Sequence, residues 1–220
     1  MARYSTGRTT KEKILKVSKD LFYEKGYHET SYNEICQKAE VNPGSIAYHF
    51  NGGKSGIAKC IYNEMMIYNQ GKTLEMFPHE DNIVKMVISL GLHQKLFFQD
   101  PAYRRFSAEY SEECLSVMSV EDYKHLIPIV YDRISKEMDE MSANFYFAAI
   151  SGMDNRIEPF IRENLDRLSY EQAVTLICEL YLWFLEKNER DEKIKRALFL
   201  LKTVEVKNEE FNITVEKMGR

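Results

Sequence analysis

Long apolar runs are absent from this chain of 220 residues. Runs such as residues 145–150 and 198–201 fall far short of the roughly 20 apolar residues that a bilayer-spanning helix needs. Residues 1–13 contain no apolar core, so they do not resemble a secretory signal. We therefore expect a cytoplasmic protein without membrane contact.

Closely spaced cysteines are also absent. The four cysteines form no C-x-x-C pair and stand at Cys36, Cys60, Cys114 and Cys178. Zinc and redox sites need thiols that lie close together, which this spacing does not indicate. We expect four buried thiols in a reducing compartment.

Signatures of catalysis are missing as well. The five histidines show no metal-binding spacing, and no G-x-S-x-G motif occurs. Gly53-Lys54-Ser55 is similar to the end of a phosphate-binding loop, but Tyr48 stands where that loop requires glycine. We expect no enzyme activity, no metal and no cofactor.

The chain has a net charge of −4, but its charges are unevenly distributed along the sequence. Residues 1–60 carry 10 Lys and Arg against 6 Asp and Glu, a net charge of 10 − 6 = +4. Residues 61–220 carry 20 against 28, a net charge of −8. A cationic end on an anionic body favours contact of that end with a polyanion.

Apolar residues recur with a spacing near 3.6 almost throughout, which predicts an all-α fold. Thr9 and Glu12 form a capping box that predicts the start of the first helix, and Gly26 predicts its end. Later helices are expected from Lys54 onward and over 81–98, 101–118, 123–138, 145–164, 169–187 and 191–206. The helix over 81–98 is apolar on nearly every side and should be buried. The pattern of residues 207–220 is ambiguous.

Two short helices lie between the first helix and the one from Lys54. Ser31 with Glu34 opens one of them, and Asn42 with Pro43 opens the other. Their mutual contact is expected at Ile35, Ala39, Val41, Ile46 and Phe50. The outer flank of the last helix is then left to small and polar residues, and such a flank can enter the major groove of DNA.

Residues 9–68 resemble the DNA-binding domain of the TetR (tetracycline repressor) family of regulators. The similarity rests on an ordered series: the helix at 14–22, Lys25-Gly26-Tyr27, Thr30, Ser31, Glu34-Ile35, Ala39, Val41, GSIAYHF at 44–50, and Lys54. It implies an N-terminal three-helix helix-turn-helix domain over residues 1–55. It also implies a C-terminal helical ligand-binding and dimerisation domain over residues 56–220.

The resemblance implies a set of DNA contacts, in which Tyr48, His49 and Lys54 hold the phosphate backbone. The full set is Ser31, Tyr32, Asn33, Asn42, Pro43, Gly44, Ser45, Ala47, Tyr48, His49 and Lys54. The chain departs from the family pattern at Ala47, where tyrosine or asparagine is common, and in the one-residue-longer turn 51–53. Both departures bear on operator preference. Arg3 and Arg8 either reach a minor groove as an arm or belong to a solvated terminus.

A body rich in Met, Phe and Tyr can enclose an adaptable apolar pocket. Similar regulators bind a small inducer in such a place, with a buried polar anchor such as His93 or Glu109. The candidate ligand contacts are Met86, Leu90, His93, Phe97, Phe106, Tyr110, Ile127 and Tyr131. Each of these residues alternatively belongs to the hydrophobic core.

Dimerisation through two late helices is also implied by the resemblance. Small residues that permit close helix approach and a second apolar stripe give the candidates Ala148, Ala149, Gly152, Leu176, Leu180, Trp183 and Phe184. Each stripe alternatively faces its own core. The sequence thus predicts a homodimeric repressor that binds a palindromic operator and is released by a small, partly apolar or aromatic inducer. The alternative is a ligand-binding or scaffold protein of the same fold that does not read DNA.

Overall fold

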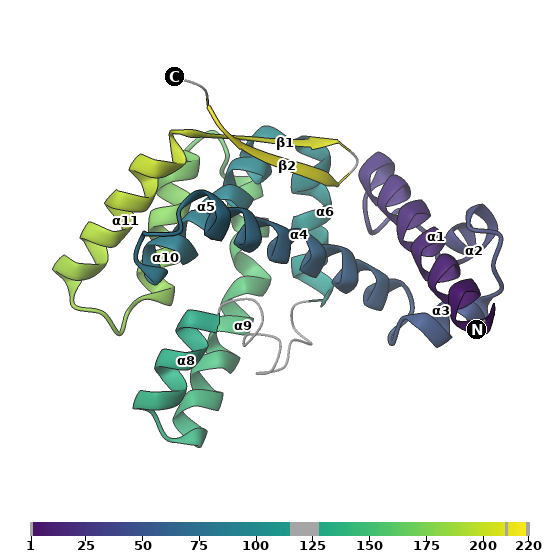
Figure 1. Ribbon diagram of the computed structural model, residues 1–220, viewed down its shortest axis with the longest axis horizontal. Helices are drawn as coiled ribbons and strands as arrows, with labels where there is room; N and C mark the ends of the chain where they lie inside the picture. Colours follow the sequence, from purple (N-terminus) through teal and green to yellow (C-terminus); the bar gives the residue numbers. More distant parts are fainter. Residues whose placement is uncertain (1, 115–127, 210, 219–220) are drawn as a thin grey trace.

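The computed structural model describes residues 2–114, 128–209 and 211–218. Its elements are α1 (Ala2–Lys25), α2 (Tyr32–Lys38), α3 (Pro43–His49), α4 (Lys54–Met76), α5 (Asn82–Gln99), α6 (Pro101–Cys114), α8 (Pro128–Glu137), α9 (Glu140–Glu163), α10 (Tyr170–Tyr181), α11 (Lys187–Leu201), β1 (Val204–Glu209) and β2 (Asn212–Lys217). Helices dominate, so the predicted all-α class is confirmed, with a C-terminal hairpin added to it. Figure 1 shows α1, α2 and α3 as a small unit at one end, which we call the head.

The head is held together by the apolar residues that the sequence assigns to it. Ile14, Ile35 and Ile46, one from each helix, are fully buried. The first helix ends as predicted at Gly26, whose φ of +92° is a left-handed conformation that favours glycine. Its predicted start at Thr9 is wrong, because α1 already runs from Ala2. A Ser/Thr-x-x-Glu pattern caps a helix only where the preceding chain is not helical, and here it is.

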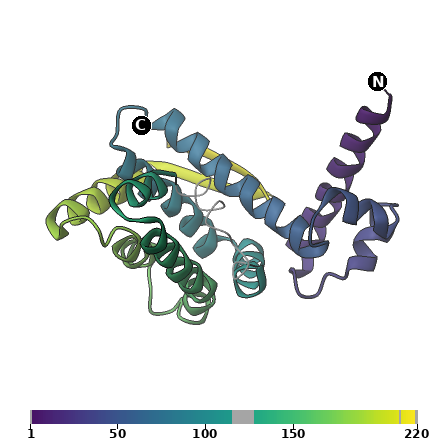
Figure 2. The same cartoon turned by 90° about the horizontal axis from the view of Figure 1, so that it is seen from below.

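The helix α4 connects the head to the rest of the chain, which we call the body (α5 to β2). Figure 2 shows α4 as the long connection between the two parts. The predicted domain division at residues 55 and 56 stays a prediction, and it falls in the first turn of α4. One continuous helix therefore crosses the predicted boundary.

The helix α5 lies at the centre of the body, in contact with α4, α6, α10 and α11. Its side chains are buried on nearly every side, as its sequence predicts. Gly91 lets α11 come close, because a Cβ atom there would lie 2.2 Å from Leu201 Cδ1. The helix α9 packs against α6 and α8. The ends of the helices predicted over 101–118 and 123–138 lie partly outside the described residues.

Two predicted helix ends in the last third of the chain are wrong. The predicted capping box of Ser169 and Gln172 does open α10, with both of its hydrogen bonds present. However, α10 ends at Tyr181 and not near Lys187. Leu182 and Leu185 remain buried in the following turn, so apolar spacing continues across the break.

The final helix also ends earlier than predicted, at Leu201 and not at Val206. The chain then forms an antiparallel hairpin in which Val206 pairs with Val215. Val204, Val206, Ile213 and Val215 are buried and alternate with exposed residues, a period-two pattern that fits a strand better than a helix. The hairpin packs on α4 and α5.

Candidate DNA-binding surface and its supports

The predicted recognition helix α3 stands at the surface of the head. Its cap forms as predicted, since Asn42 Oδ1 accepts a hydrogen bond from Ser45 N at 2.9 Å and Pro43 occupies the first turn. Ile46 points inward and is fully buried. Tyr48 is 84% exposed, and Pro43, Gly44 and Ala47 are exposed as well. No described segment covers this flank, so it is open to a partner.

The helix α2 contributes both to this surface and to its support. Ser31 caps α2 by accepting a hydrogen bond from Glu34 N at 3.1 Å, and Asn33 is exposed. Tyr32 is half-buried, and its hydroxyl donates to Pro43 O at 2.9 Å. Tyr32 therefore fastens the start of α3 to α2, and its predicted DNA contact stays a prediction. Ser45 and His49 are half-buried at the edge of the same surface.

Lys54 is partly buried against the chain between α1 and α2. Its ammonium donates to Tyr27 O and to Thr30 O, each at 3.0 Å, and lies 4.1 Å from the centroid of the Tyr27 ring. These contacts tie the first turn of α4 to the chain between α1 and α2. The phosphate contact that the resemblance implies for Lys54 stays a prediction, and the structure gives this side chain a role in joining α4 to the head.

The head has further contacts with α6 of the body. Arg105 Nη2 donates to Tyr23 O at 2.8 Å, and Glu109 Oε2 accepts from His28 N at 3.0 Å. A Cβ atom at Gly26 would lie only 2.7 Å from Glu109 Oε2. Glu109 is buried as an anchor should be, but it binds the head and not the interior of the body.

The hairpin also reaches the head. Phe211, between β1 and β2, is 3% exposed and lies edge-on to Tyr23 of α1, with ring centroids 5.4 Å apart. Its ring is also 4.8 Å from that of Phe106 on α6. Figure 1 shows this end of the hairpin beside α1. Within the described residues, the head is thus held by three connections: α4, α6 and the hairpin.

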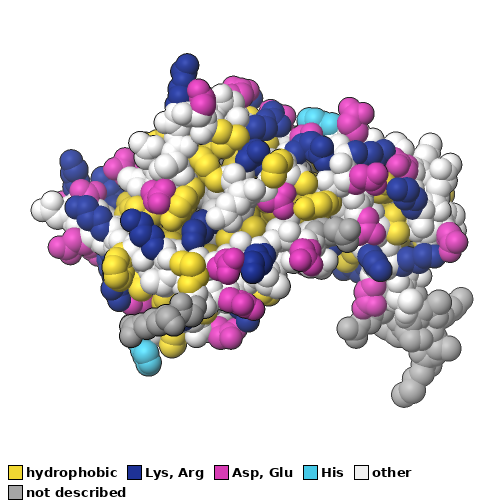
Figure 3. Space-filling view, turned by 90° about the horizontal axis from the view of Figure 1, so that it is seen from above, with side chains coloured by type: hydrophobic (Ala, Val, Ile, Leu, Met, Phe, Trp, Pro, Cys, Tyr) yellow, Lys and Arg dark blue, Asp and Glu magenta, His cyan; other side chains and the backbone are white. Residues whose placement is uncertain are grey.

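Charge on the head is largely compensated by nearby acidic groups. Lys13 pairs with Glu40 at 2.6 Å, and Lys25 pairs with Glu34. On the described part of the face in Figure 3, Lys and Arg side chains are interspersed with Asp and Glu side chains.

A buried polar network joins α5, α6 and α9 in the body. His93 Nε2 lies 2.5 Å from Glu158 Oε1, and His93 Nδ1 lies 2.6 Å from the Tyr103 hydroxyl. Ser107 and Ser111 donate to Glu158 Oε2 at 2.6 and 2.9 Å. Burial alone would raise the pKa of Glu158, but the charge of His93 and these hydrogen bonds outweigh it and hold the pKa below its ordinary value.

The predicted ligand contacts lie in or beside this packed interior. The ring of Tyr62 on α4 stacks on that of Tyr110, with the two ring centroids 4.5 Å apart. The centroids of the Tyr62 and His93 rings are 5.9 Å apart. Buried members of the set are Met86, His93, Phe97, Phe106 and Tyr110, while Leu90 and Tyr131 are partly buried. Ile127 lies outside the described residues. Their role in ligand binding stays a prediction.

The predicted dimer contacts lie on α9, on α10 and in the turn that follows α10. Leu176, Leu180 and Trp183 are each about half exposed, at 50, 48 and 51%. Phe184 is half-buried, and Ala148, Ala149 and Gly152 are exposed. This exposure argues against the alternative, that these stripes face the core of the same chain, for Leu176, Leu180 and Trp183, and the predicted dimer contacts stay a prediction. Phe145 on α9, 77% exposed, was not in the predicted set.

The cysteines fit the expectation of four buried thiols only in part. Cys36 and Cys178 are buried, but Cys60 is only partly buried; Cys114 has no described side chain. Burial raises the pKa of Cys178 to about 12, which keeps this thiol inert.

Among the described residues, no cluster of three His, Cys, Asp or Glu is placed to hold a metal ion. Within the same residues, no helix has the length and apolarity needed to cross a bilayer.

Sequence reasoning missed Arg105, Phe211 and Glu158 as supports of the head and body. Alternation of Val204 and Val206, and of Ile213 and Val215, was the available signal for the hairpin. Nothing local in the sequence marks the other two, because their partners are far away along the chain. His93 and Glu158 are 65 residues apart.

Comparison with known proteins agrees with the geometry of the head. The sequence profile of "Bacterial regulatory proteins, tetR family" matches residues 14–59. The transcriptional regulator LmrA of Bacillus subtilis (strain 168) is 40% identical over 63 residues, which cover 29% of this chain and 34% of LmrA. The biofilm operon regulator IcaR of Staphylococcus aureus (strain Newman) is 26% identical over 144 residues, covering 53% of this chain and 77% of IcaR.

Among solved structures, the fatty acid degradation regulator FadR from Bacillus halodurans aligns with a TM-score of 0.42 and 16% identity, over 81% of this chain and 95% of that one. The sequence match to LmrA spans about a third of that protein. The sequence relatives are named as transcriptional regulators and not as enzymes. Residues 14–59, which run from α1 to the start of α4, are thus similar to the N-terminal domain of the tetR family of bacterial regulatory proteins.

Proposed function

We propose that the protein is a ligand-responsive transcriptional repressor that binds a palindromic operator as a homodimer in the cytoplasm. The observation that carries this proposal is the exposed flank of α3, where Tyr48 is 84% exposed beside the small residues Gly44 and Ala47. A short helix with small residues near its N-terminus can bring its backbone close to bases and phosphates. Repression is supported by the name of IcaR, a negative transcriptional regulator.

Dimerisation is proposed through α9 and α10. Their exposed apolar side chains form one stripe on each helix, and the exposed small residues Ala148 and Gly152 let a second helix approach. Apart from its chain neighbours and the nearby backbone of α9, no described atom lies within 4 Å of a Cβ placed at Gly152. Two copies would bury these stripes in a four-helix interface. Two heads held about 34–36 Å apart, or at a multiple of that distance, would match successive major-groove faces.

Release by an inducer is proposed to act through α4. A ligand among the predicted interior residues would contact Tyr62 or its neighbours on α4, and Lys54 in the first turn of this helix is tied to the head. The ligand must bind the released state better than the DNA-bound state, since equal affinity would shift nothing. The contacts of Arg105 and Glu109 with the head must adjust in the same transition.

The proposal is tested by selecting genomic fragments on the purified protein and measuring affinity for the enriched sequence by gel shift. We expect an inverted repeat and an affinity that falls by about 1,000-fold between 50 and 200 mM salt, because phosphate contacts release counterions. Tyr48→Ala should weaken binding about 10-fold without changing thermal stability, because the side chain is exposed.

The matched control is Phe199→Ala, which removes another exposed aromatic ring, 62% exposed on α11. It should leave operator affinity unchanged. If no fragment is enriched, or if both variants weaken binding equally, DNA readout by α3 is refuted. The alternative of a ligand-binding or scaffold protein would then be favoured.

A further inference from the structure

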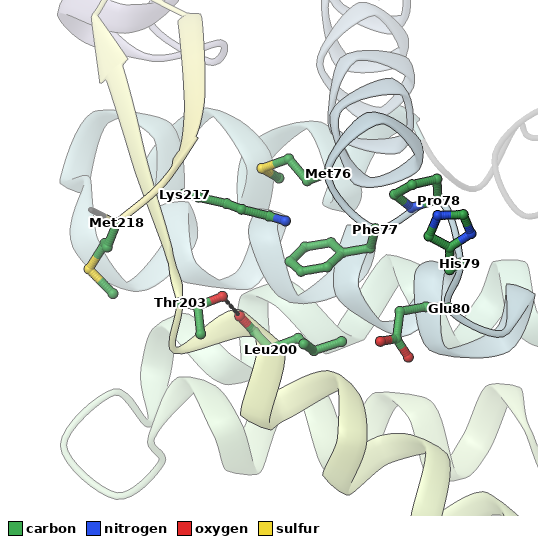
Figure 4. A pocket seen from close by; sticks show the side chains of 9 residues that line it. All are labelled: Met76, Phe77, Pro78, His79, Glu80, Leu200, Thr203, Lys217 and Met218. Atoms are coloured by element: carbon green, nitrogen blue, oxygen red, sulfur yellow. Dashed lines mark hydrogen bonds between the residues drawn. The ribbon is translucent and has the colours of Figure 1, made fainter. Parts of the chain in front are cut away.

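A cavity of about 570 Å³ lies between the end of α4, the end of α11 and the end of β2. Figure 4 shows the side chains around it, with the Phe77 ring and the Lys217 side chain on opposite sides and directed toward each other. This volume is in the range of small-molecule sites in proteins. None of the predicted ligand contacts that the structure describes lines it. We propose that the cavity binds a small organic anion with an apolar body.

The walls of the cavity favour an apolar ligand body. Met76, Phe77 and Pro78 line one side, and Leu200 and Met218 line the other. The Thr203 hydroxyl, which also faces the cavity, donates to Leu200 O at 2.7 Å. The hydrogen that Thr203 can offer is therefore already engaged.

The charges of the cavity favour an anionic group on the ligand. Glu80 is neutralised by Arg196, with its two oxygens 2.5 and 3.2 Å from the guanidinium nitrogens. The Lys217 ammonium lies 4.9 Å from the centroid of the Phe77 ring. Among the residues that the structure describes, no carboxylate forms an ion pair with it. A cation beside an aromatic ring, at the edge of an apolar cavity, is complementary to a carboxylate on an apolar chain or ring.

The position of the cavity gives a bound ligand access to the head. Met76 and Phe77 end α4, the helix whose other end is tied to the head by Lys54. Lys217 ends β2, and Phe211 at the opposite end of the hairpin packs on Tyr23 of α1. A ligand between these two ends would therefore touch two of the three connections to the head. Its action as an effector rests on the proposed function, whereas its binding does not.

The binding test uses the full chain and two probes of matched shape, 4-phenylbutyrate and the neutral 4-phenylbutan-1-ol. Isothermal titration calorimetry should show tighter binding of the acid. Lys217→Gln should lower the affinity for the acid about five-fold, since the ion pair is partly exposed. It should leave the affinity for the alcohol unchanged. Lys217→Glu should lower the affinity for the acid further. The control is Lys207→Gln, because Lys207 lies on β1 outside the cavity and pairs with Glu205.

The location of binding is read by amide hydrogen exchange. In the presence of 4-phenylbutyrate, exchange should slow in the hairpin and around residues 76–80. Absence of binding, equal affinity for acid and alcohol, or slowing around His93 in place of the hairpin would each overturn the proposal. These measurements need no DNA, so their failure is separate from a failure of operator binding.

Discussion

The flank of α3 and the outer face of α9 and α10 are both exposed, but they expose different chemistry. The α3 flank presents Gly44, Ala47 and Tyr48 at the end of the chain with excess positive charge. The α9 and α10 face presents large apolar side chains such as Leu176 and Leu180. A surface of the first kind suits a hydrated polyanion, and one of the second kind suits a second apolar face. The comparison shows that exposure becomes informative only together with side-chain type.

The largest expected effect follows from placing a charge in the apolar face. Leu180→Glu would bury a carboxylate in the proposed dimer interface, which costs several kcal/mol unless the charge is paired. We expect a monomer by analytical ultracentrifugation. We also expect operator affinity to fall by about 100-fold or more, because the two heads no longer bind as one unit.

The matched change is Phe199→Glu, which places the same charge at an exposed apolar residue of α11. The Phe199→Glu variant should remain dimeric and bind the operator as the wild type does. If Leu180→Glu stays dimeric, the assignment of the α9 and α10 face is wrong, and the contrast with the α3 flank loses its basis.

The inner side of α9 sharpens the comparison, because it carries the buried Glu158. Glu158→Ala would leave His93 and two serine hydroxyls without their partner in the interior. Removing one partner of a buried pair costs about 3–5 kcal/mol of unfolding free energy. Urea denaturation measures this loss. Glu163→Ala, an exposed position on the same helix, should change stability by less than about 0.5 kcal/mol.

The pH dependence of stability tests the same carboxylate. The pKa of Glu158 in the folded protein is below its ordinary value, so its charged form stabilises the fold. This contribution is complete above the unfolded-state pKa, about 4.3, and is lost as pH falls through the lower folded-state pKa. The stability difference between wild type and Glu158→Gln should therefore be constant from pH 7 to 5 and shrink below that range. A difference that grows with acidity would contradict the direction of the shift.

The smallest effect is expected at the cap of α3. Asn42→Ala removes the acceptor for Ser45 N and should lower the unfolding free energy by about 1 kcal/mol. Asn42→Asp keeps an acceptor and should be nearly neutral in thermal unfolding. Operator affinity should fall for both, because alanine loosens α3 and aspartate adds negative charge next to phosphate. Undiminished affinity in both variants would place DNA contacts away from the start of α3.

The sequence predicted the local features of the head well. Gly26, Ser31 and Asn42 end or begin helices as expected, because capping and left-handed turns depend on a few neighbouring residues. The start of α1 was wrong, since a capping pattern is the same inside a helix as at its end. The hairpin was missed because its two short strands were read together with the preceding helical pattern.

The candidate sites likewise divide into those that follow from local sequence patterns and those that do not. The exposed flank of α3 and the apolar stripes of α9 and α10 follow from helical periodicity, which assigns each residue to a face. The pairing of His93 with Glu158, the contact of Phe211 with Tyr23 and the cavity beside Lys217 do not follow from it. Each of these joins residues from different elements.

By itself the sequence determined the helical class, the caps of α2 and α3 and which side chains of the head face outward. These depend on contacts within about one helical turn, which the order of residues specifies directly. Only the tertiary structure decided how the head is attached: through α4, through Arg105 and Glu109 of α6, and through the C-terminal hairpin. Such attachments arise from packing between segments up to about 190 residues apart, which local residue patterns do not encode.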